Sequence, residues 1–313
     1  MMKVLITGAA GFIGYHTAKE MIKRGYEVIA VDSLIRGKPE RLKELKEEGA
    51  RICVMDVREE KEIKNIIKRE KVEAVIHLAA LISVEESFQK PLLYNSINAG
   101  GTLSLLKAST EADVEKFVYI STATVYGKPQ YLPIDEEHPT NPLSPYGVSK
   151  LAGEEYLKMY QRTTGIKGII LRLFNVYGPG QTGAYAGVIT KFIERASRGE
   201  PLIIYGDGEQ TRDFIHVKDV ANVIIKALET NTTGTFNIAS GKPTRIIDLA
   251  HMVISLTGLN LQPIFTEPRK GDIRHSYAKI DRAREVLKWE PKIDLKQGLK
   301  ELIKYRLRQK DSM

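Results

Sequence analysis

The chain has 313 residues, of which 42% are hydrophobic and 27% charged, as in ordinary globular proteins of one or two domains. Its net charge of +8 comes from basic residues that alternate with acidic ones along predicted helices, so we expect solvated faces and no nucleic-acid partner. The residues before the first predicted strand lack the pattern of a secretory signal, so we expect none. No apolar run reaches roughly 18 residues, and a single cysteine, Cys53, excludes an intrachain disulfide. We expect a cytoplasmic protein with no membrane partner and no metal, in which Cys53 is a buried structural thiol.

Strand-like and helix-like segments alternate through the first half of the chain. The predicted strands are 3–9, 27–33, 51–57, 74–80, 116–122 and 168–176. The amphipathic segments between them are chiefly 12–24, 59–70, 91–112 and 146–163. Alternation of nearly continuous apolar strands with helices predicts right-handed crossovers and a parallel sheet that is covered on both faces. The fold class is therefore α/β, a Rossmann-type doubly wound parallel sheet.

The pattern changes after residue 176. A loop rich in Gly and Pro, 177–187, precedes shorter helical and strand-like segments, namely 188–199, 202–205, 213–217, 219–229 and 235–239. The remainder is mostly helical and contains the loop 268–272. We predict a first domain of 1–176, to which 206–239 return, and a smaller, mostly helical C-terminal lobe made of 177–205 and 240–313.

Three glycines follow the first predicted strand and open the first helix: Gly8, Gly11 and Gly14. In this position glycines allow a tight turn and close approach of a pyrophosphate to the helix N-terminus, although the spacing is one residue longer than the standard dinucleotide fingerprint. Asp32 ends the second predicted strand, where a carboxylate accepts hydrogen bonds from the adenosine ribose. It would repel a 2′-phosphate and favours NAD over NADP, an argument that nearby Arg36 and Lys38 weaken.

The motif Tyr146-x-x-x-Lys150 begins a predicted helix, with both side chains on one face. An adjacent ammonium lowers the pKa of a tyrosine and makes it a usable base. By itself such a pair is usually only a surface pair on a helix. Thr122 adds to the signal, because it ends the fifth predicted strand and its hydroxyl is expected in the same crevice, where Asp56 and Val57 of the third strand would border the adenine.

These residues occur together with HLAA (77–80), STATVYG (121–127), LRLFNVYGPG (171–180), GDGEQTRDFIHVKDVA (206–221) and EPRKGDIRHSYAKIDRA (267–283). In this order and spacing the chain resembles the extended short-chain dehydrogenase/reductases, and among them it is most similar to the UDP-hexose 4-epimerases. The resemblance covers essentially the whole chain. It implies an enzyme with an NAD-binding first domain and a nucleotide-sugar-binding lobe.

The resemblance also implies roles for individual residues. Tyr146 would be the acid and base, Lys150 its electrostatic partner and a ribose ligand, and Thr122 the hydroxyl that orients the substrate. The cofactor would further contact Phe12, Ile13, Leu78, Ala79, Ala80, Leu81, Asn98 and Phe174. The nucleotide sugar would contact Asn175, Gly187, Val188, Tyr205, Arg212, Arg269, Asp272 and Ser276. A surface pairing of Arg212 with Asp207 or Asp213 is the plainer alternative for that arginine.

The implied reaction is epimerisation at C4 of a UDP-sugar through a transient 4-keto sugar, with NAD as a temporary hydride store. A 4,6-dehydratase is disfavoured, because the Asp-Glu pair that follows the active-site Thr in those enzymes is replaced by Ala123 and Thr124. A UDP-glucuronate epimerase or decarboxylase stays open, as does a catalytically silent dinucleotide-sensing protein. Ser276 in place of a bulky residue suggests that an N-acetyl group is accepted beside UDP-glucose, and family members commonly form homodimers through the helices here at 91–112 and 146–163.

Overall fold

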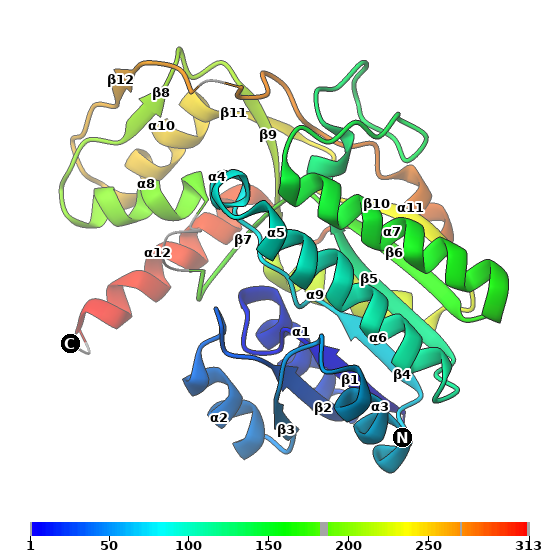
Figure 1. The fold of residues 1–313 in the computed structure, drawn as a ribbon. Helices are drawn as coiled ribbons and strands as arrows, with labels where there is room; N and C mark the ends of the chain where they lie inside the picture. Colours follow the sequence, from blue (N-terminus) through cyan, green and yellow to red (C-terminus); the bar gives the residue numbers. More distant parts are fainter. Residues whose placement is uncertain (1, 182–186, 270, 312–313) are drawn as a thin grey trace.

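The computed structural model describes residues 2–181, 187–269 and 271–311. The predicted loops 177–187 and 268–272 therefore lie partly outside the described residues, at 182–186 and at Lys270. Figure 1 shows a large sheet with helices on both faces and, above its carboxyl edge, a smaller lobe built largely from the second half of the chain.

The large sheet has seven strands in the order β10-β6-β5-β4-β1-β2-β3, and all of its pairings are parallel. Its strands are β1 (Lys3–Thr7), β2 (Glu27–Asp32), β3 (Arg51–Val54), β4 (Ala74–His77), β5 (Lys116–Thr122), β6 (Lys167–Leu173) and β10 (Gly234–Ile238). The central strands are apolar along their length because both faces are covered. The predicted doubly wound fold is confirmed.

The side chains of β1 show how the two faces are filled. Val4 and Ile6 join the core on one face, which includes residues of α1 (Phe12–Lys23), α2 (Pro39–Glu47) and α9 (Val217–Glu229). Leu5 points the other way, into the core that includes residues of α3 (Glu60–Glu70), α6 (Gly101–Thr110) and α7 (Pro145–Thr164). Successive strand residues alternate between faces, so a strand buried on both sides must be apolar throughout.

The predicted helix 91–112 is one helical run that contains a π-helical segment. After α4 (Val84–Gln89), the chain forms α5 (Pro91–Tyr94), a π-helical turn η1 (Asn95–Gly100) and then α6. Inside the widened turn, the Asn98 amide donates to the Leu81 carbonyl at 2.9 Å, and its oxygen accepts from the Leu81 N–H at 2.8 Å. The predicted helix is confirmed, but its π-helical turn was not predicted, because apolar periodicity does not register such a bulge.

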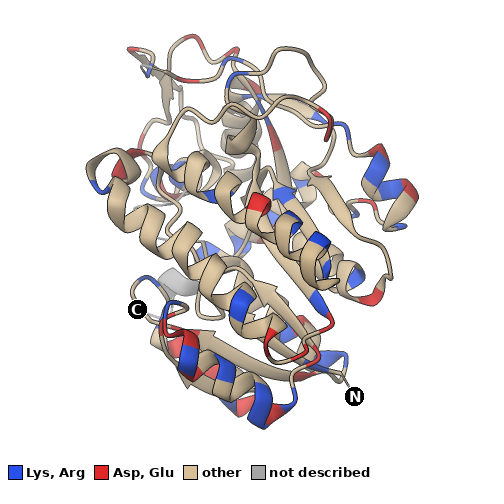
Figure 2. Cartoon of the chain, turned by 45° about the vertical axis from the view of Figure 1, so that its right-hand side comes forward, with Lys and Arg blue, Asp and Glu red and all other residues tan. Residues whose placement is uncertain are grey.

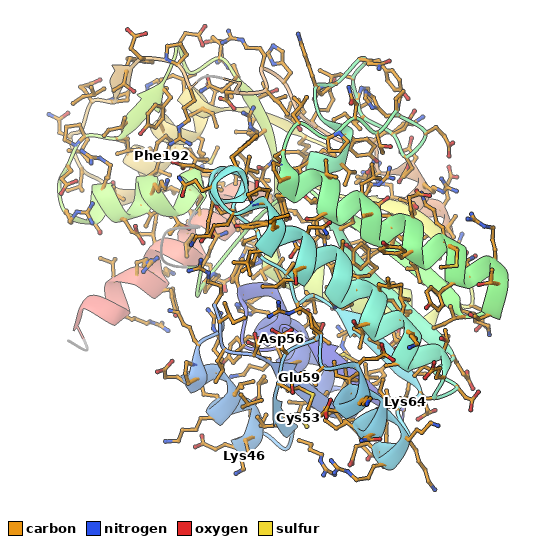
Figure 3. All side chains as sticks on the ribbon, viewed as in Figure 1. Lys46, Cys53, Asp56, Glu59, Lys64 and Phe192 are labelled. Atoms are coloured by element: carbon orange, nitrogen blue, oxygen red, sulfur yellow. The ribbon has the colours of Figure 1, made fainter. Side chains whose placement is uncertain are left out.

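The second lobe has its own small sheets and core. Its elements are β7 (Asn175–Tyr177), α8 (Val188–Ser197), β8 (Ile203–Tyr205), β9 (Thr211–His216), β11 (Pro243–Arg245), α10 (Ile246–Thr257), β12 (Ile264–Thr266) and α12 (Leu295–Asp311), whereas α11 (Asp281–Val286) packs elsewhere. The strands pair as β11-β9-β7 and as β12-β8. Phe192 of α8, labelled in Figure 3, is buried in the apolar core formed with α10 and α12.

Three segments lie in places that the sequence did not indicate. The predicted strand 168–176 is split, because β6 ends at Leu173 and β7 pairs with β9 in the second sheet. Within 206–239, β10 and α9 belong to the large sheet whereas β9 does not. The segment 281–289, assigned above to the second lobe, packs with Ala283 and Trp289 against the core of the large sheet.

The charged residues are mixed along the outer helices. Figure 2 shows Lys and Arg interspersed with Asp and Glu on the helices at the bottom of the view, and the α5 end of the helical run from α5 to α6 carries few charges. Cys53 lies half-buried on β3, at the edge of the large sheet (Figure 3), and burial raises the pKa of its thiol. Among the described residues, no helix has the length and apolar character needed to cross a membrane.

Candidate active site

A cavity of about 510 Å³ opens at the carboxyl edge of the large sheet. It is lined by residues at or just after the ends of β1 to β6, together with Asn175, Gly180 and Gly187 from the beginning of the second lobe. The crevice outside the carboxyl ends of parallel strands is where open α/β sheets bind ligands.

The glycine loop forms one wall of this cavity. Gly8 has φ of +71°, and a Cβ there would lie 2.7 Å from the Ala79 backbone nitrogen. A Cβ on Gly14 would lie 2.1 Å from the Gly8 carbonyl oxygen, so only glycine lets the turn and α1 close on each other. Gly11 caps α1 without a side-chain hydrogen bond, which leaves first-turn N–H groups to meet an anion.

Asp32 is fixed at the end of β2. Its Oδ2 accepts from the Ala10 N–H at 2.9 Å and its Oδ1 from the Leu34 N–H at 2.8 Å. Burial raises the pKa of this carboxyl group, and the two N–H groups oppose the increase. Arg36 pairs with Glu86 of α4, with Nη2 and Oε1 2.6 Å apart. Its guanidinium is thus engaged by a carboxylate, which weakens its case as a ligand for a 2′-phosphate.

Almost all of the predicted cofactor residues line this cavity. They are Gly8, Gly11, Phe12, Ile13, Gly14, Asp32, Asp56, Val57, Leu78, Ala79, Ala80, Leu81, Tyr146, Lys150 and Phe174. Asp56, labelled in Figure 3, pairs with Arg58 at 2.8 Å, which lowers the pKa of its carboxyl group. Asn98 is the exception: it does not line the cavity and instead holds Leu81, which does.

The structure brings Thr122, Tyr146 and Lys150 together in the same cavity. Thr122 ends β5, and its hydroxyl accepts from the Thr124 N–H at 3.2 Å. Tyr146 lies in the first turn of α7, where Pro145 starts the helix and the Ser144 hydroxyl caps it. Lys150 follows one turn later. Strand end and helix start therefore converge, as the motif spacing predicted.

Burial controls the ionisation of both groups on α7. It raises the pKa of Tyr146 to about 12, and the Thr122 hydroxyl, within hydrogen-bonding reach, opposes the increase. It lowers the pKa of Lys150 to about 7, against the attraction of Glu154. We expected Lys150 to lower the pKa of Tyr146, but in this structure desolvation of the phenol outweighs any such effect.

The predicted substrate residues divide into two groups. Asn175 and Gly187 line the cavity. The others belong to a cluster on the second lobe and do not line it: Val188, Tyr205, Arg212, Arg269, Asp272 and Ser276. Within this cluster the Arg269 guanidinium lies 4.0 Å from the centre of the Tyr205 ring, and Arg212 pairs with Asp272. The amide of Asn175 connects the groups, since it donates to the Asp213 carbonyl on β9 at 2.9 Å.

The alternative that Arg212 pairs with Asp207 or Asp213 is wrong for both aspartates. Asp207 is held by Arg274, with contacts of 2.7 and 2.8 Å. The Asp213 carboxylate is buried and accepts from Ser240, Gly241 and Ala278. Arg212 pairs with Asp272 because β9 and the loop after β12 run side by side, an arrangement that local sequence does not reveal.

Sequence reasoning missed Arg41. From α2 its guanidinium donates to the Ala10 carbonyl at 3.1 Å and to the Gly180 carbonyl at 2.6 Å, so it joins the glycine loop to the second lobe. It sits in a helix that we interpreted as a solvated charged face, and no local signal separates it from its neighbours. Further lining residues that we did not single out include Ser33, Ile35, Met55, Ile97, Ile120, Val176 and Gln181.

The family model described as "NAD dependent epimerase/dehydratase family" matches residues 4–239, which include the glycine loop, Thr122 and the Tyr146/Lys150 pair. The chain belongs to this family.

Relatives of this epimerase/dehydratase family member extend the match to nearly its whole length. UDP-glucose 4-epimerase of Mycolicibacterium smegmatis is 35% identical over 311 residues, covering 97% of this chain and 98% of the relative. The solved UDP-glucose 4-epimerase of Thermotoga maritima has a TM-score of 0.94 and 38% identity, over 98% of this chain and 99% of that one. The UDP-N-acetylglucosamine 4-epimerase of Methanobrevibacter ruminantium has a TM-score of 0.94 and 35% identity, with the same coverage.

Proposed function

We propose that this chain is an NAD-dependent epimerase that inverts C4 of a UDP-hexose. The observation that carries the proposal is the convergence of Thr122, Tyr146 and Lys150 in the cavity that the glycine loop also lines. Relatives named UDP-glucose 4-epimerase, similar over nearly the entire chain, support the assignment. We keep the proposed division into an NAD-binding domain and a nucleotide-sugar-binding lobe, each supplying one side of the site.

The cavity fits NAD. The uncapped N-terminus of α1 offers N–H groups to the pyrophosphate. Asp32 would hold the adenosine ribose, with Asp56 and Val57 beside the adenine. Leu78 to Leu81, with Phe12, Ile13 and Phe174, would enclose the rest of the cofactor. When bound, NAD supplies a reversible hydride acceptor for C4 of the sugar.

The protein's own groups handle the proton. Tyr146 takes the proton of the sugar 4-hydroxyl as C4 is oxidised. It returns the proton to the 4-keto oxygen after the sugar has rotated to present its other face. Thr122 holds the same oxygen in line. Because burial opposes ionisation of Tyr146, a nearby positive charge is required, and Lys150 on the next turn provides it while also binding the cofactor ribose. General acid and base assistance of this kind is worth about 10²- to 10⁴-fold in rate.

Dehydration needs a further acid and base that this site does not offer. The two residues after Thr122 are Ala123 and Thr124, in the 3-10 turn η2 (Ala123–Tyr126). Neither side chain can remove a C5 proton or protonate a departing 6-hydroxyl. Epimerisation, which needs one proton carrier, matches the groups that are present.

The second lobe would bind the UDP part of the substrate. Arg212 and Arg269 would face the diphosphate, and Asn175 would hold it at the mouth of the cavity. The Tyr205 ring, which the Arg269 guanidinium contacts, would stack near the uracil. Asp272 would accept from the uridine ribose, and Gly187 and Val188 at the start of α8 would close that side.

Ser276 provides the hypothesis about the sugar. It is partly buried, and its N–H donates to the Thr211 carbonyl at 3.2 Å, on the strand that carries Arg212. A small residue beside the sugar's 2-substituent would admit an N-acetyl group. Ser276→Tyr should therefore reduce activity on UDP-N-acetylglucosamine far more than on UDP-glucose. An unchanged ratio of the two rates would remove this hypothesis.

A homodimer completes the proposal. The surface along α4, α5 and α7 exposes large apolar side chains: Val84, Phe88, Leu92, Leu93, Val148 and Met159. Leu92 is 85% exposed, whereas Leu105 and Leu106 farther along the same helical run are fully buried. Pairing this face with a second copy would form a four-helix bundle, because an apolar face of this kind is stabilised by burial.

The test is incubation of the purified protein and catalytic NAD with UDP-glucose, UDP-N-acetylglucosamine, UDP-glucuronate and dTDP-glucose in turn, with products resolved by proton NMR. We expect the 4-epimer without net NADH. A 4-keto-6-deoxy product or stoichiometric NADH would overturn the proposal. Tyr146→Phe should lose 10²- to 10⁴-fold in turnover while it still binds NAD.

A further inference from the structure

A buried ion pair lies beneath the candidate active site and is not part of it. Glu154 of α7 is fully buried, and Arg172 of β6 is 3% exposed. The Arg172 guanidinium donates from Nε to Glu154 Oε1 at 3.0 Å and from Nη2 to Oε2 at 2.6 Å. A buried pair of this kind is weak evidence of stabilisation, because desolvating two charges offsets much of their attraction. Its position in the fold suggests another role.

The Glu154 carboxylate joins the three elements that build the site. It lies on α7 one turn after Lys150. The Ser121 hydroxyl, which donates to Glu154 Oε1, comes from β5 immediately before Thr122. Arg172 lies on β6, three residues before Asn175. One carboxylate thus connects α7, which carries Tyr146 and Lys150, to β5, which ends in Thr122, and to β6, which leads to Asn175 at the start of β7.

Glu154 is also the anion whose attraction raises the pKa of Lys150. The Lys150 ammonium lies 4.1 Å from the centre of the Tyr119 ring on β5, whose hydroxyl donates to the Lys150 carbonyl at 3.1 Å. His77 on β4 is fully buried between Thr7 and Thr102, and burial holds its pKa well below the ordinary value, so its ring is neutral and adds no positive charge.

On α7 itself Lys150 is flanked by Tyr146 and Glu154, and Arg172 on β6 is the cation behind Glu154. The pKa of Lys150 is lowered by burial and raised by Glu154. Tyr119 and His77 are neutral, because burial raises the pKa of the phenol and lowers that of the imidazole. Before Tyr146 ionises, Glu154 is therefore the anion in this group whose removal changes the field at Lys150.

We propose that Glu154 is a positioning residue of the proposed epimerase, whose carboxylate aligns Lys150 with Thr122 and supplies the negative charge opposite the ammonium. This inference rests on the proposed function. Arg172 and Ser121 orient the carboxylate, and Lys150 transmits its effect to Tyr146. Retention of a costly buried pair at this point then serves catalysis and not stability.

The test compares Glu154→Gln with Glu154→Gln/Arg172→Met. The double variant removes the guanidinium that the single variant leaves unpaired, and replacement of both charges by neutral groups is often tolerated. In both variants we expect kcat to fall at least tenfold with KM nearly unchanged. The alkaline limb of the kcat profile should move about one to two pH units lower in Glu154→Gln, as expected for loss of a charge one helical turn away, and by less in the double variant, which also loses the Arg172 cation.

A second readout needs no turnover. In protein labelled with ¹⁵N-lysine, the Lys150 side-chain signal, assigned with Lys150→Met, should titrate lower in both variants than in the wild type. The shift should be about one to two pH units in Glu154→Gln and smaller in the double variant, which also loses the Arg172 cation. A folded double variant with the wild-type titration midpoint, or with lower kcat and an unshifted pH profile, would overturn the inference. Absence of epimerisation by the wild type would overturn the proposed function alone, since the titration is measured independently.

Discussion

Replacement of Lys150 by methionine should stabilise the protein while abolishing its activity. Lys150 is 3% exposed, and burial lowers its pKa from 10.5 to about 7. Each pKa unit corresponds to about 1.4 kcal/mol, so the buried ammonium costs about 5 kcal/mol of folding free energy when it is fully protonated. Loss of the contact with the Tyr119 ring, worth about 2 kcal/mol when desolvated, reduces the net gain to about 3 kcal/mol.

The effect has a definite pH dependence. Below pH 7 Lys150 is protonated in both the folded and unfolded states, and the whole cost is present. Between pH 7 and 10.5 the unfolded state binds more protons, so wild-type stability should rise by about 1.4 kcal/mol per pH unit relative to Lys150→Met. Above pH 10.5 the cost disappears. At pH 9 the difference should thus be about 2 kcal/mol before the lost ring contact is subtracted.

The assay is urea unfolding of NAD-free wild type and Lys150→Met at pH 6, 7.5 and 9. Lys46→Met, on the exposed face of α2 (Figure 3), serves as the control and should leave the pH slope unchanged. If Lys150→Met is no more stable than the wild type at pH 6, or if the difference does not shrink toward pH 9, the reasoning from desolvation is refuted. Stabilisation at the expense of function is common at active sites.

Three other predictions concern the cofactor loop, the second lobe and assembly. Gly14→Ala places a Cβ 2.1 Å from the Gly8 carbonyl oxygen and should cost about 1–3 kcal/mol of stability and most of the NAD affinity. In the control Gly100→Ala the new Cβ meets nothing nearer than 3.8 Å, so stability and NAD affinity should both be retained. Thermal unfolding measures the first quantity and calorimetry the second. Tyr177→Phe should raise stability by about 1 kcal/mol in urea unfolding, because its buried hydroxyl has no hydrogen-bond partner among the described residues; a loss would indicate an unseen partner. Leu92→Glu should convert the proposed dimer to monomers in light scattering, and an unchanged mass would place the interface elsewhere.

The large sheet and most of the lining of the candidate site could be predicted because their signals are local. Runs such as Val28–Val31 are apolar on both faces, and Gly8 and Gly14 occur where backbone approaches backbone. The convergence of Thr122 and Tyr146 could be predicted, because the sequence indicates both the end of a strand and the start of a helix.

The remainder depends on contacts between distant segments. The π-helical turn contains Asn98, whose side chain bonds the N–H and the carbonyl of Leu81, and nothing in the surrounding apolar pattern indicates this contact. The pairing of Arg212 with Asp272 depends on how β9 meets the loop after β12. Glu154 looks like one more charge on a helix until Arg172, buried on a neighbouring strand, is placed against it.

The position of β10 in the chain has a consequence for biosynthesis. β6 leaves the ribosome well before its outer neighbour, because α8, β8, β9 and α9 are all made between them. Until residue 238 emerges, β6 presents a nascent, apolar edge of the kind that pairs with other chains. A fragment that ends after β6 lacks β10, and a fragment that begins after β6 contains β10 without β6. Truncations between β6 and β10 should therefore yield aggregates instead of folded fragments. A functional split of the gene would have to encode β6 and β10 on the same fragment.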